Sequence, residues 1–333
     1  MKAIVLNRKL AEGIESVDIS LPVLPSDEVR IEVKSASLNH RDEWCRQGKY
    51  ANLKDGIILG SDASGIVVEV GQDVDPKWIG KEVIINPASD WGANPDVQSK
   101  EFKIMGMPEH GTLAEFVQVK SNRLHSKPDH LDWDEAAALP LGGVTAYRAL
   151  FQQGNIQAKD QVLVTGFGGG VAQFGVQFAL SLGAKVFVSS SNDDKIQKAL
   201  ELGCSGGFNY TNEKWTEKAM SECGGFDLIM DSAMGDTLNN LIKVTKPAGR
   251  IVFYGATRGN STGFESRRVF WNQVKLIGST MGNDSDFENM LNFVKENKIV
   301  PLIDRVFDFE GAVQAFDRMK EGKQMGKIVI KIS

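Results

Sequence analysis

The stretch Val162-Leu-Val-Thr-Gly-Phe-Gly-Gly-Gly-Val-Ala-Gln-Phe-Gly-Val-Gln-Phe-Ala-Leu-Ser-Leu-Gly-Ala-Lys-Val186 predicts a strand, a glycine-rich turn, a helix and a second strand in one continuous run. Residues 162–164 form a short apolar run that is typical of a buried parallel strand. Apolar residues then recur at three- and four-residue spacing, which indicates a helix with one face against a sheet. The backbone N–H groups and the dipole at the start of such a helix favour an anion, so we expect a dinucleotide pyrophosphate there.

The glycine spacing departs from the strict fingerprint G-x-G-x-x-G, because Val171 stands where the third glycine would be. A shifted register, Gly166-x-x-Gly169-x-x-Ala172, keeps small residues at the turn, at the closest approach to the ligand and at the helix–strand contact. A plain tight turn is the alternative. We expect the cofactor to contact Gly166, Gly168, Gly169, Gly170, Val171 and Ala172.

Composition bounds the class of protein. The 333 residues exceed the usual size of one domain, and 38 basic against 43 acidic residues give a net charge of -5 without any basic block. Neither nucleic acid nor an anionic membrane surface is indicated as a partner. The three cysteines are an odd number without short spacing, which argues against a disulfide framework and suits a reducing compartment. No apolar run has the length of a bilayer span, so we expect a cytoplasmic protein.

The order of the predicted elements indicates two domains. Up to about residue 119, short runs such as Val29–Val33 and Glu82–Ile85 predict a small β-barrel, and the polar stretch Asp90–His110 predicts a long surface loop. Strands and helices alternate from residue 161 onward, which predicts an α/β fold with a doubly wound parallel sheet. The predicted strands are 162–164, 185–188, 226–230, 250–253 and 275–278, and the predicted helices between them are 171–182, 193–202, 214–221 and 236–244.

Motifs along the whole chain resemble the medium-chain dehydrogenase/reductase superfamily, and more narrowly its zinc-free quinone oxidoreductase branch. The motifs are Asn39-His-Arg-Asp42 with Arg46-x-Gly-x-Tyr50, Gly60-Ser-Asp-Ala-Ser-Gly-Ile-Val-Val-Glu-Val-Gly71, Gly111-Thr-Leu-Ala-Glu-Phe116, Thr145-Ala-Tyr147, the glycine turn, Asp231-Ser-Ala-x-Gly235 and Gly326-Lys-Ile-Val329. The resemblance implies a GroES-like β-barrel catalytic domain at 1–127 and 283–333 and a Rossmann cofactor-binding domain at 128–282. It also implies catalysis in the cleft between them.

The same resemblance argues against a metal. Asn39 takes the place of the first zinc-binding cysteine of the zinc-dependent members, and Ser61-Asp62 takes the place of their His-Glu pair. The loop at Asp90–His110 has none of the four cysteines that a structural zinc site needs. His40, Asp42 and Cys45 lie close in sequence but lack a helical spacing and a fourth donor.

The end of the second predicted strand, Val188-Ser-Ser-Ser-Asn-Asp-Asp-Lys195, selects between the nicotinamide cofactors. An NAD site usually carries Asp or Glu there, whereas the hydroxyls of Ser189, Ser190 and Ser191 and the ammonium of Lys195 suit the 2′-phosphate of NADPH. The resemblance adds Tyr210 beside that phosphate. The alternative is that Asn192 and Asp193 only cap the helix and Lys195 points to solvent, in which case NAD would bind through Asp193 or Asp194. Further expected cofactor contacts are Thr145, Gly255, Ala256, Thr257, Ser279 and Thr280.

Without a metal as Lewis acid, conjugated acceptors are favoured over unactivated alcohols, because hydride addition spreads charge into an enolate or a hydroquinone anion. We expect Tyr50 as proton donor or oxygen anchor, with Asn39 and Arg46 as its catalytic partners. The alternatives are an aromatic wall for Tyr50, a turn residue for Asn39 and a salt bridge with Asp42 for Arg46.

The predicted activity is NADPH-dependent reduction of a quinone or an α,β-unsaturated carbonyl. A zinc-independent alcohol or enoyl-thioester reductase and a low-turnover NADPH-binding sensor or structural protein remain open. The partner is a small-molecule carbonyl or quinone. We expect a homodimer in which the predicted last strand of the parallel sheet, Lys275–Gly278, pairs edge to edge with the same strand of a second copy.

Overall fold

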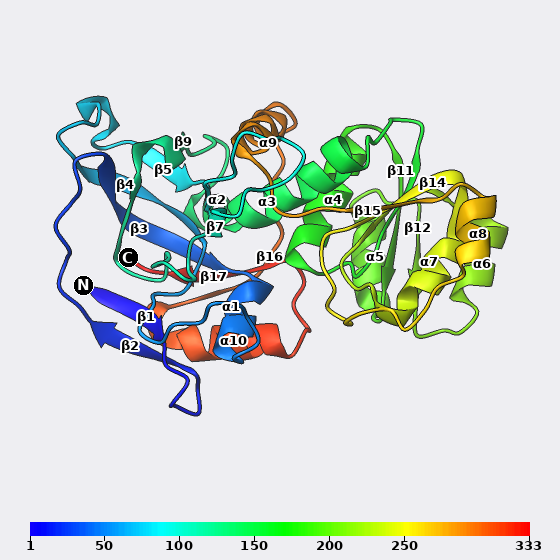
Figure 1. Ribbon diagram of the computed structural model, residues 1–333, viewed down its shortest axis with the longest axis horizontal. Helices are drawn as coiled ribbons and strands as arrows, with labels where there is room; N and C mark the ends of the chain where they lie inside the picture. Colours follow the sequence, from blue (N-terminus) through cyan, green and yellow to red (C-terminus); the bar gives the residue numbers. More distant parts are fainter. The chain divides into compact units, whose positions relative to one another are not determined.

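The computed structural model describes residues 1–333, and its chain contacts divide it into two units (Figure 1). Unit 1 comprises Met1–Gly142 and Asn283–Ser333, and unit 2 comprises Gly143–Gly282. The second division falls where the sequence predicts it, at 282/283. The first lies later than the expected boundary after residue 127, because helix α2 (Trp133–Ala138) packs on strands of unit 1. Ser64 Oγ, for example, donates to the carbonyl of Trp133 at 2.6 Å.

Unit 1 is built on a mostly antiparallel sheet in the strand order β16-β17-β3-β4-β5-β9, with β8 paired to β3. The strands are β3 (Glu28–Leu38), β4 (Asp62–Val70), β5 (Glu82–Ile85), β8 (Phe116–Lys120), β9 (Leu124–Ser126), β16 (Ile303–Phe307) and β17 (Lys327–Lys331), and two small pairs add β1 (Lys2–Leu6) with β2 (Ile14–Asp18) and β6 (Ala88–Ser89) with β7 (Lys103–Ile104). The alternating residues of β3 place Val29, Ile31 and Val33 in the core at 0% exposure. The end of the chain therefore completes this sheet through β17, which pairs with β3.

Three further helices flank the sheet of unit 1: α1 (His40–Arg46), α9 (Asp284–Glu296) and α10 (Ala312–Lys320). Helix α1 follows β3 directly and begins at Asn39, whose backbone N–H donates to Asp42 Oδ2 at 2.8 Å. Helices α1 and α10 contact each other. The abrupt strand-to-helix change at Asn39 fixes where the polar side chains of 39–42 lie.

Unit 2 contains a six-stranded parallel sheet in the order β12-β11-β10-β13-β14-β15. Its strands are β10 (Gln161–Val164), β11 (Lys185–Ser190), β12 (Gly206–Asn209), β13 (Phe226–Asp231), β14 (Thr245–Phe253) and β15 (Lys275–Gly278), and its helices are α4 (Gly170–Ser181), α5 (Asp193–Glu201), α6 (Trp215–Cys223), α7 (Leu238–Val244) and α8 (Ser266–Trp271). The strand order reverses between β10 and β13, which makes the sheet doubly wound and confirms the predicted class. The carboxyl end of β10 is therefore the switch point.

Some elements were not predicted. Strand β12 has the sequence Gly-Gly-Phe-Asn, which carries no alternation, and helices α1 and α8 are only one or two turns long. The run at residues 144–150 does predict a helix, which the structure contains as α3 (Pro140–Tyr147), but no sequence pattern marks its continuation as a π-helical segment at Arg148–Gln153. No helix combines the length and the apolar character needed to cross a bilayer.

Candidate functional site

The glycine turn between β10 and α4 depends on backbone conformations that favour glycine. Gly166 and Gly168 have φ of 63° and 111°. The N–H of Phe167, between them, donates to the carbonyl of Ser189 at 2.9 Å and so ties the turn to the end of β11. Gly169 is the N-cap of α4, which begins at Gly170. Helix N-termini leave their first N–H groups without intrahelical acceptors, so this turn fits a pyrophosphate.

The contact between α4 and the sheet involves a further small residue, Gly175. The shifted register assigned this contact to Ala172, which is buried at 2% exposure. A Cβ at Gly175, one turn later, would lie 2.7 Å from Met230 Sδ and 3.6 Å from Val164 Cγ1. A side chain at Gly175 would collide with Met230 of β13, so the close packing of α4 on the sheet also depends on this glycine.

Lys195 lies over the glycine turn rather than in solvent. A Cβ at Gly168 would lie 2.7 Å from Lys195 Cδ and 2.8 Å from Lys195 Nζ. The Lys195 side chain is partly buried. Asn192 does cap α5, since its Oδ1 accepts from the N–H groups of Asp194 at 2.7 Å and of Lys195 at 3.3 Å. The alternative correctly assigned a capping role to Asn192, but the ammonium of Lys195 lies beside the glycine turn and does not point to solvent.

The end of β11 brings further polar groups to the same region. Ser189 and Ser190 are each 3% exposed, whereas Ser191 is exposed. The carbonyl of Ser190 accepts from the N–H of Tyr210 at 3.1 Å, which holds Tyr210 next to β11. The guanidinium of Arg258 lies 5.7 Å from the centroid of the Tyr210 ring. Arg258 is a cation that the sequence analysis missed.

The turns after β14 and β15 carry the remaining predicted cofactor contacts of unit 2. Thr257 donates its N–H to the carbonyl of Ser232 at 3.1 Å, and a Cβ at Gly255 would lie 3.1 Å from the same oxygen. Ala256 and Thr280 are exposed. The Oγ of Ser279 is buried and has no hydrogen-bond partner. A buried hydroxyl without a partner in the protein fits a bound dinucleotide.

Thr145 lies within unit 2 on α3. It is 5% exposed, and its Oγ1 lies 3.7 Å from Met281 Sδ. Met281 has a φ of 44°, a conformation that bulky residues rarely adopt. The structure therefore places Thr145 beside the predicted turn at Ser279–Gly282.

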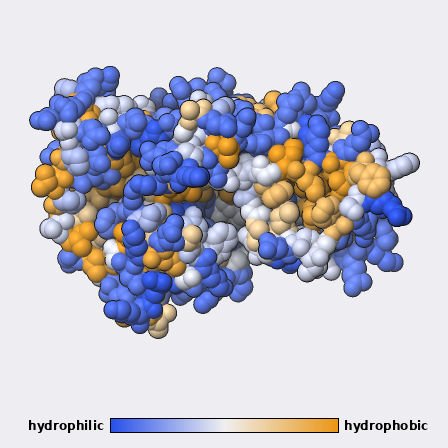
Figure 2. Space-filling view, viewed as in Figure 1, coloured by the Kyte–Doolittle hydropathy of each residue, from blue (hydrophilic) through white to orange (hydrophobic).

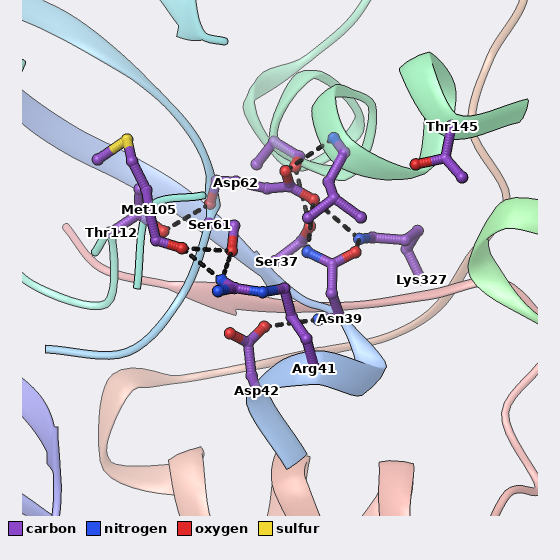
Figure 3. Close-up of polar contacts among 12 residues, drawn as sticks. Ser37, Asn39, Arg41, Asp42, Ser61, Asp62, Met105, Thr112, Thr145 and Lys327 are labelled. Carbon is purple, nitrogen blue, oxygen red and sulfur yellow. Dashed lines mark hydrogen bonds and ion pairs between the residues drawn. The ribbon is translucent and has the colours of Figure 1, made fainter. Parts of the chain in front are cut away.

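In unit 1, two buried side chains converge on the ammonium of Lys327, which is itself buried (Figure 3). Lys327 Nζ donates to Asn39 Oδ1 at 2.7 Å and to Asp62 Oδ2 at 2.9 Å. Lys327 is 2% exposed, Asp62 0% and Asn39 8%. Asp62 also accepts from Asn39 Nδ2 at 2.9 Å, from Ser37 Oγ at 3.2 Å and from the N–H of Leu141 at 2.8 Å. The residues aligned by resemblance with metal ligands, Asn39 and Asp62, thus hold an ammonium.

Arg41 lies beside this cluster and contacts Tyr50. Its Nε donates to Tyr50 Oη at 3.3 Å, and its guanidinium lies 4.9 Å from the centroid of the tyrosine ring. Its Nη1 donates to Ser61 Oγ at 2.6 Å, and the same guanidinium binds the carbonyls of Ile104, Met105 and Met107. Arg41 therefore fixes both the 104–107 loop and the hydroxyl of Tyr50.

Arg46, the predicted catalytic arginine, is held in ion pairs. Its Nε lies 2.6 Å from Glu43 Oε2 and its Nη1 lies 2.8 Å from Asp317 Oδ1. Its guanidinium also lies 5.4 Å from the centroid of the Phe316 ring. These contacts favour the alternative of a salt bridge, although the partners are Glu43 and Asp317 and not the expected Asp42. Arg41 is the arginine that contacts Tyr50.

Burial changes the protonation of the groups around Asn39. Burial raises the pKa of Asp42, although the charge of Arg41 opposes this change. Burial lowers the pKa of His40, and the Lys327 ammonium lowers it further. Burial also raises the pKa of Cys45 to about 12, so its thiol is a poor nucleophile. The chain has no cluster of three or more His, Cys, Asp or Glu side chains arranged to hold a metal ion.

Lys327, Arg41 and Arg258 are the residues that sequence reasoning missed. Lys327 stands in the Gly326-Lys-Ile-Val motif, which is separated from Asn39 by most of the chain. Lys327 and Asn39 come together because β17 pairs antiparallel with β3, which places Ile328 opposite Leu38. The signal available in the sequence was the position of a lysine at the start of a buried closing strand.

Two family models match separate parts of this chain. Residues 25–129 match the family model of the alcohol dehydrogenase GroES-like domain, and residues 170–296 match that of zinc-binding dehydrogenase. A zinc-type alcohol dehydrogenase-like protein, YogA, of Leptosphaeria maculans is 35% identical over 94% of this chain and 93% of its own length. A crotonyl-CoA reductase of Streptomyces avermitilis is 27% identical over 95% of this chain and 81% of its own. A crystal structure of an NAD-dependent alcohol dehydrogenase superposes with a TM-score of 0.95 at 33% identity, covering 100% of both chains.

Proposed function

Because this chain belongs to the medium-chain dehydrogenase/reductase superfamily and is an oxidoreductase, we propose that it is an NADPH-dependent reductase of quinones or α,β-unsaturated carbonyls that uses no metal. The observation that carries the proposal is the Lys327 ammonium, which lies 2.7 Å from Asn39 Oδ1 and 2.9 Å from Asp62 Oδ2. Because Asn39 Oδ1 and Asp62 Oδ2 already bind the ammonium, these two oxygens are not available as ligands for a metal cation. The reaction therefore has to proceed with hydrogen-bond donors in place of a Lewis acid.

The proposed preference for NADPH depends on the groups at the end of β11. Lys195 supplies a positive charge beside the glycine turn, and Ser190 and Tyr210 supply hydroxyls. Arg258, stacked on the Tyr210 ring, adds a second cation. A 2′-phosphate carries charge that these groups would pair, whereas a ribose diol would not. NADH is the competing cofactor, because the structural neighbour at 33% identity is described as NAD-dependent.

The proposed chemistry is hydride addition to a conjugated acceptor. Bound NADPH would supply the hydride. Tyr50, with its hydroxyl held by Arg41 Nε at 3.3 Å, is the proposed donor of the proton that the reduced product needs. Arg41 makes this hydroxyl available as a donor, because the arginine occupies a lone pair and not the O–H proton. Asn39 and Thr145 are proposed to contact the nicotinamide half of the cofactor.

Steady-state oxidation of NADPH with 1,4-benzoquinone, 9,10-phenanthrenequinone, a 2-alkenal and crotonyl-CoA tests the assignment. We expect turnover with at least one quinone or the alkenal, unchanged by EDTA. Preference for crotonyl-CoA would favour the enoyl-thioester reductase, which is the second candidate because of the crotonyl-CoA reductase relative. Tight NADPH binding without any turnover would favour a binding protein. Loss of activity on EDTA treatment and recovery with zinc would contradict the metal-free reaction.

A homodimer is the proposed assembly, formed through β15 at the edge of the unit 2 sheet. Helix α8 immediately precedes β15, and its Phe270 and Trp271 are 66% and 78% exposed. Phe264 adds a third exposed aromatic ring at 47%. Figure 2 shows apolar residues gathered over this part of unit 2. A second copy that pairs β15 edge to edge would cover these residues and satisfy the free strand edge.

The proposed location is cytoplasmic. All three cysteines are free thiols, and Cys45 and Cys204 are buried. Free thiols suit a reducing compartment.

A further inference from the structure

The ammonium of Lys327 has one N–H without an acceptor in the protein. A lysine ammonium carries three N–H donors, and two of them are directed at Asn39 Oδ1 and Asp62 Oδ2. Lys327 is 2% exposed, and buried donors are paired in the great majority of cases. The remaining N–H is free to donate to an oxygen from outside the protein, which is a water molecule or an atom of a bound ligand.

The charges around Lys327 favour an anionic oxygen at that place. Asp62 is saturated by four donors, so its carboxylate is fully engaged. Asp42 accepts only from the N–H of Asn39, and its Oδ1 has no partner. Burial raises the pKa of Asp42, while the charge of Arg41 lowers it. The guanidinium of Arg41 is buried among neutral oxygens. The Lys327 ammonium is thus paired with a carboxylate that three other donors also engage, and its third N–H faces no carboxylate of the protein.

We propose that Lys327 is a catalytic residue whose free N–H donates to the carbonyl oxygen of the substrate, where negative charge develops during reduction. This inference rests on the proposed function. In an enone, the new C–H bond forms at the β-carbon with the electron pair of the hydride, and the C=C π pair becomes the C=C of the enolate while the C=O π pair moves to oxygen. The substrate is reduced, NADPH is oxidised to NADP⁺, and one proton completes the product. A charged donor at that oxygen stabilises the transition state more than the ground state.

Asn39 has a positioning role in this arrangement. Its Oδ1 accepts from Lys327 and its Nδ2 donates to Asp62, so the amide orientation is fixed by both charges. Asp62 is in turn anchored by the N–H of Leu141 at 2.8 Å. The ammonium is therefore held on two sides, which directs the third N–H without the loss of rotamer entropy that a free lysine would suffer on binding.

The first test compares Lys327→Met with the double variant Lys327→Met/Asp62→Asn. Loss of one donor to an oxyanion typically lowers kcat about 100- to 1,000-fold, and we expect this fall in both variants while the dissociation constant of NADPH stays within about twofold of the wild type. The double variant removes both buried charges, so it avoids the unpaired carboxylate that destabilises the single variant. Recovery of kcat in the double variant, or a weakened NADPH affinity with kcat intact, would overturn the proposal. Lys331→Met, on the exposed end of the same strand, is the matched control and should retain full activity.

A second test needs no turnover. 4-Nitrophenol, bound to the complex with NADP⁺, reports the fraction ionised by its absorption, and its phenolate oxygen stands in for the enolate oxygen. We expect the wild type and Lys331→Met to ionise it at lower pH than Lys327→Met does. Equal ionisation in these proteins, or no binding to the wild type, would overturn the proposal. If no acceptor is reduced while this difference is found, the proposed activity is wrong and the anionic-oxygen site at Lys327 stands.

Discussion

Gly168 and Lys195 compete for one space: a Cβ at Gly168 would lie 2.7 Å from Lys195 Cδ and 2.8 Å from its Nζ. The glycine also has a φ of 111°, which residues with a side chain rarely adopt. Approach of a ligand is therefore not the only reason for a glycine-rich turn. Gly168 also leaves room for the side chain of Lys195 on helix α5.

Replacement of Gly168 by alanine should weaken NADPH binding and destabilise the protein. The methyl group forces Lys195 away from the turn, and the strained backbone costs about 1–3 kcal/mol in the free energy of unfolding. Isothermal titration with NADPH and urea unfolding measure the two effects. Gly263→Ala is the control, because a Cβ there meets no atom within 4 Å and its φ is not positive. Unchanged NADPH affinity in Gly168→Ala would show that the position of Lys195 is unimportant.

Lys195→Ala combined with Ser190→Asp should shift the preference from NADPH toward NADH. The change removes a cation that would pair the 2′-phosphate and adds a carboxylate that repels it and accepts from the ribose hydroxyls. Charged hydrogen bonds are worth about 1.5–3 kcal/mol, so the ratio of the KM values for NADPH and NADH should rise roughly 10- to 100-fold. Lys198→Ala, on the same helix but paired with Glu201 at 2.9 Å, should leave the ratio unchanged. An unchanged ratio in the double variant would contradict the cofactor assignment.

Sequence reasoning predicted features that depend on local pattern. Strand β15 was predicted at its observed bounds, and α4 to within one residue at each end, because apolar periodicity and glycine punctuation decide both. Gly168 and Lys195 belong to two neighbouring βα units. The sequence predicted both as cofactor contacts, but it did not predict that they lie against each other. The cluster of Asn39, Asp62 and Lys327 joins segments separated by up to 288 positions in sequence. Its geometry follows from strand pairing in unit 1, which no local pattern contains.

Asp42→Asn should flatten the pH dependence of stability. Burial raises the pKa of Asp42 above its ordinary value of 3.8, so the folded protein binds this proton more tightly than the unfolded chain does. Its contribution to stability is complete below the unfolded pKa and is lost as pH rises through the folded pKa. The variant keeps an acceptor for the N–H of Asn39 and should therefore be more stable than the wild type at neutral pH, with the two converging at acidic pH.

Urea unfolding between pH 3.5 and 8 measures this difference. Asp55→Asn provides a control of opposite sign, because the hydrogen bonds from Arg8 lower the pKa of the exposed Asp55. Its contribution is present above the unfolded pKa and is lost as pH falls. A wild type that gains stability relative to Asp42→Asn as pH rises would show that Asp42 is stabilised as a carboxylate.

Trp271→Lys combined with Ile277→Lys should produce a monomer. Trp271 is 78% exposed, and Ile277 lies in the edge strand β15, so two lysines on each copy would place like charges against each other across a two-fold axis. Sedimentation equilibrium should give about twice the mass of one chain for the wild type and the mass of one chain for the variant. Leu200→Lys, at a site 40% exposed on α5, is the control and should remain dimeric. A monomeric wild type, or a dimer that survives both lysines, would place the interface elsewhere or remove it, because an edge-to-edge pair cannot tolerate four ammonium groups at its centre.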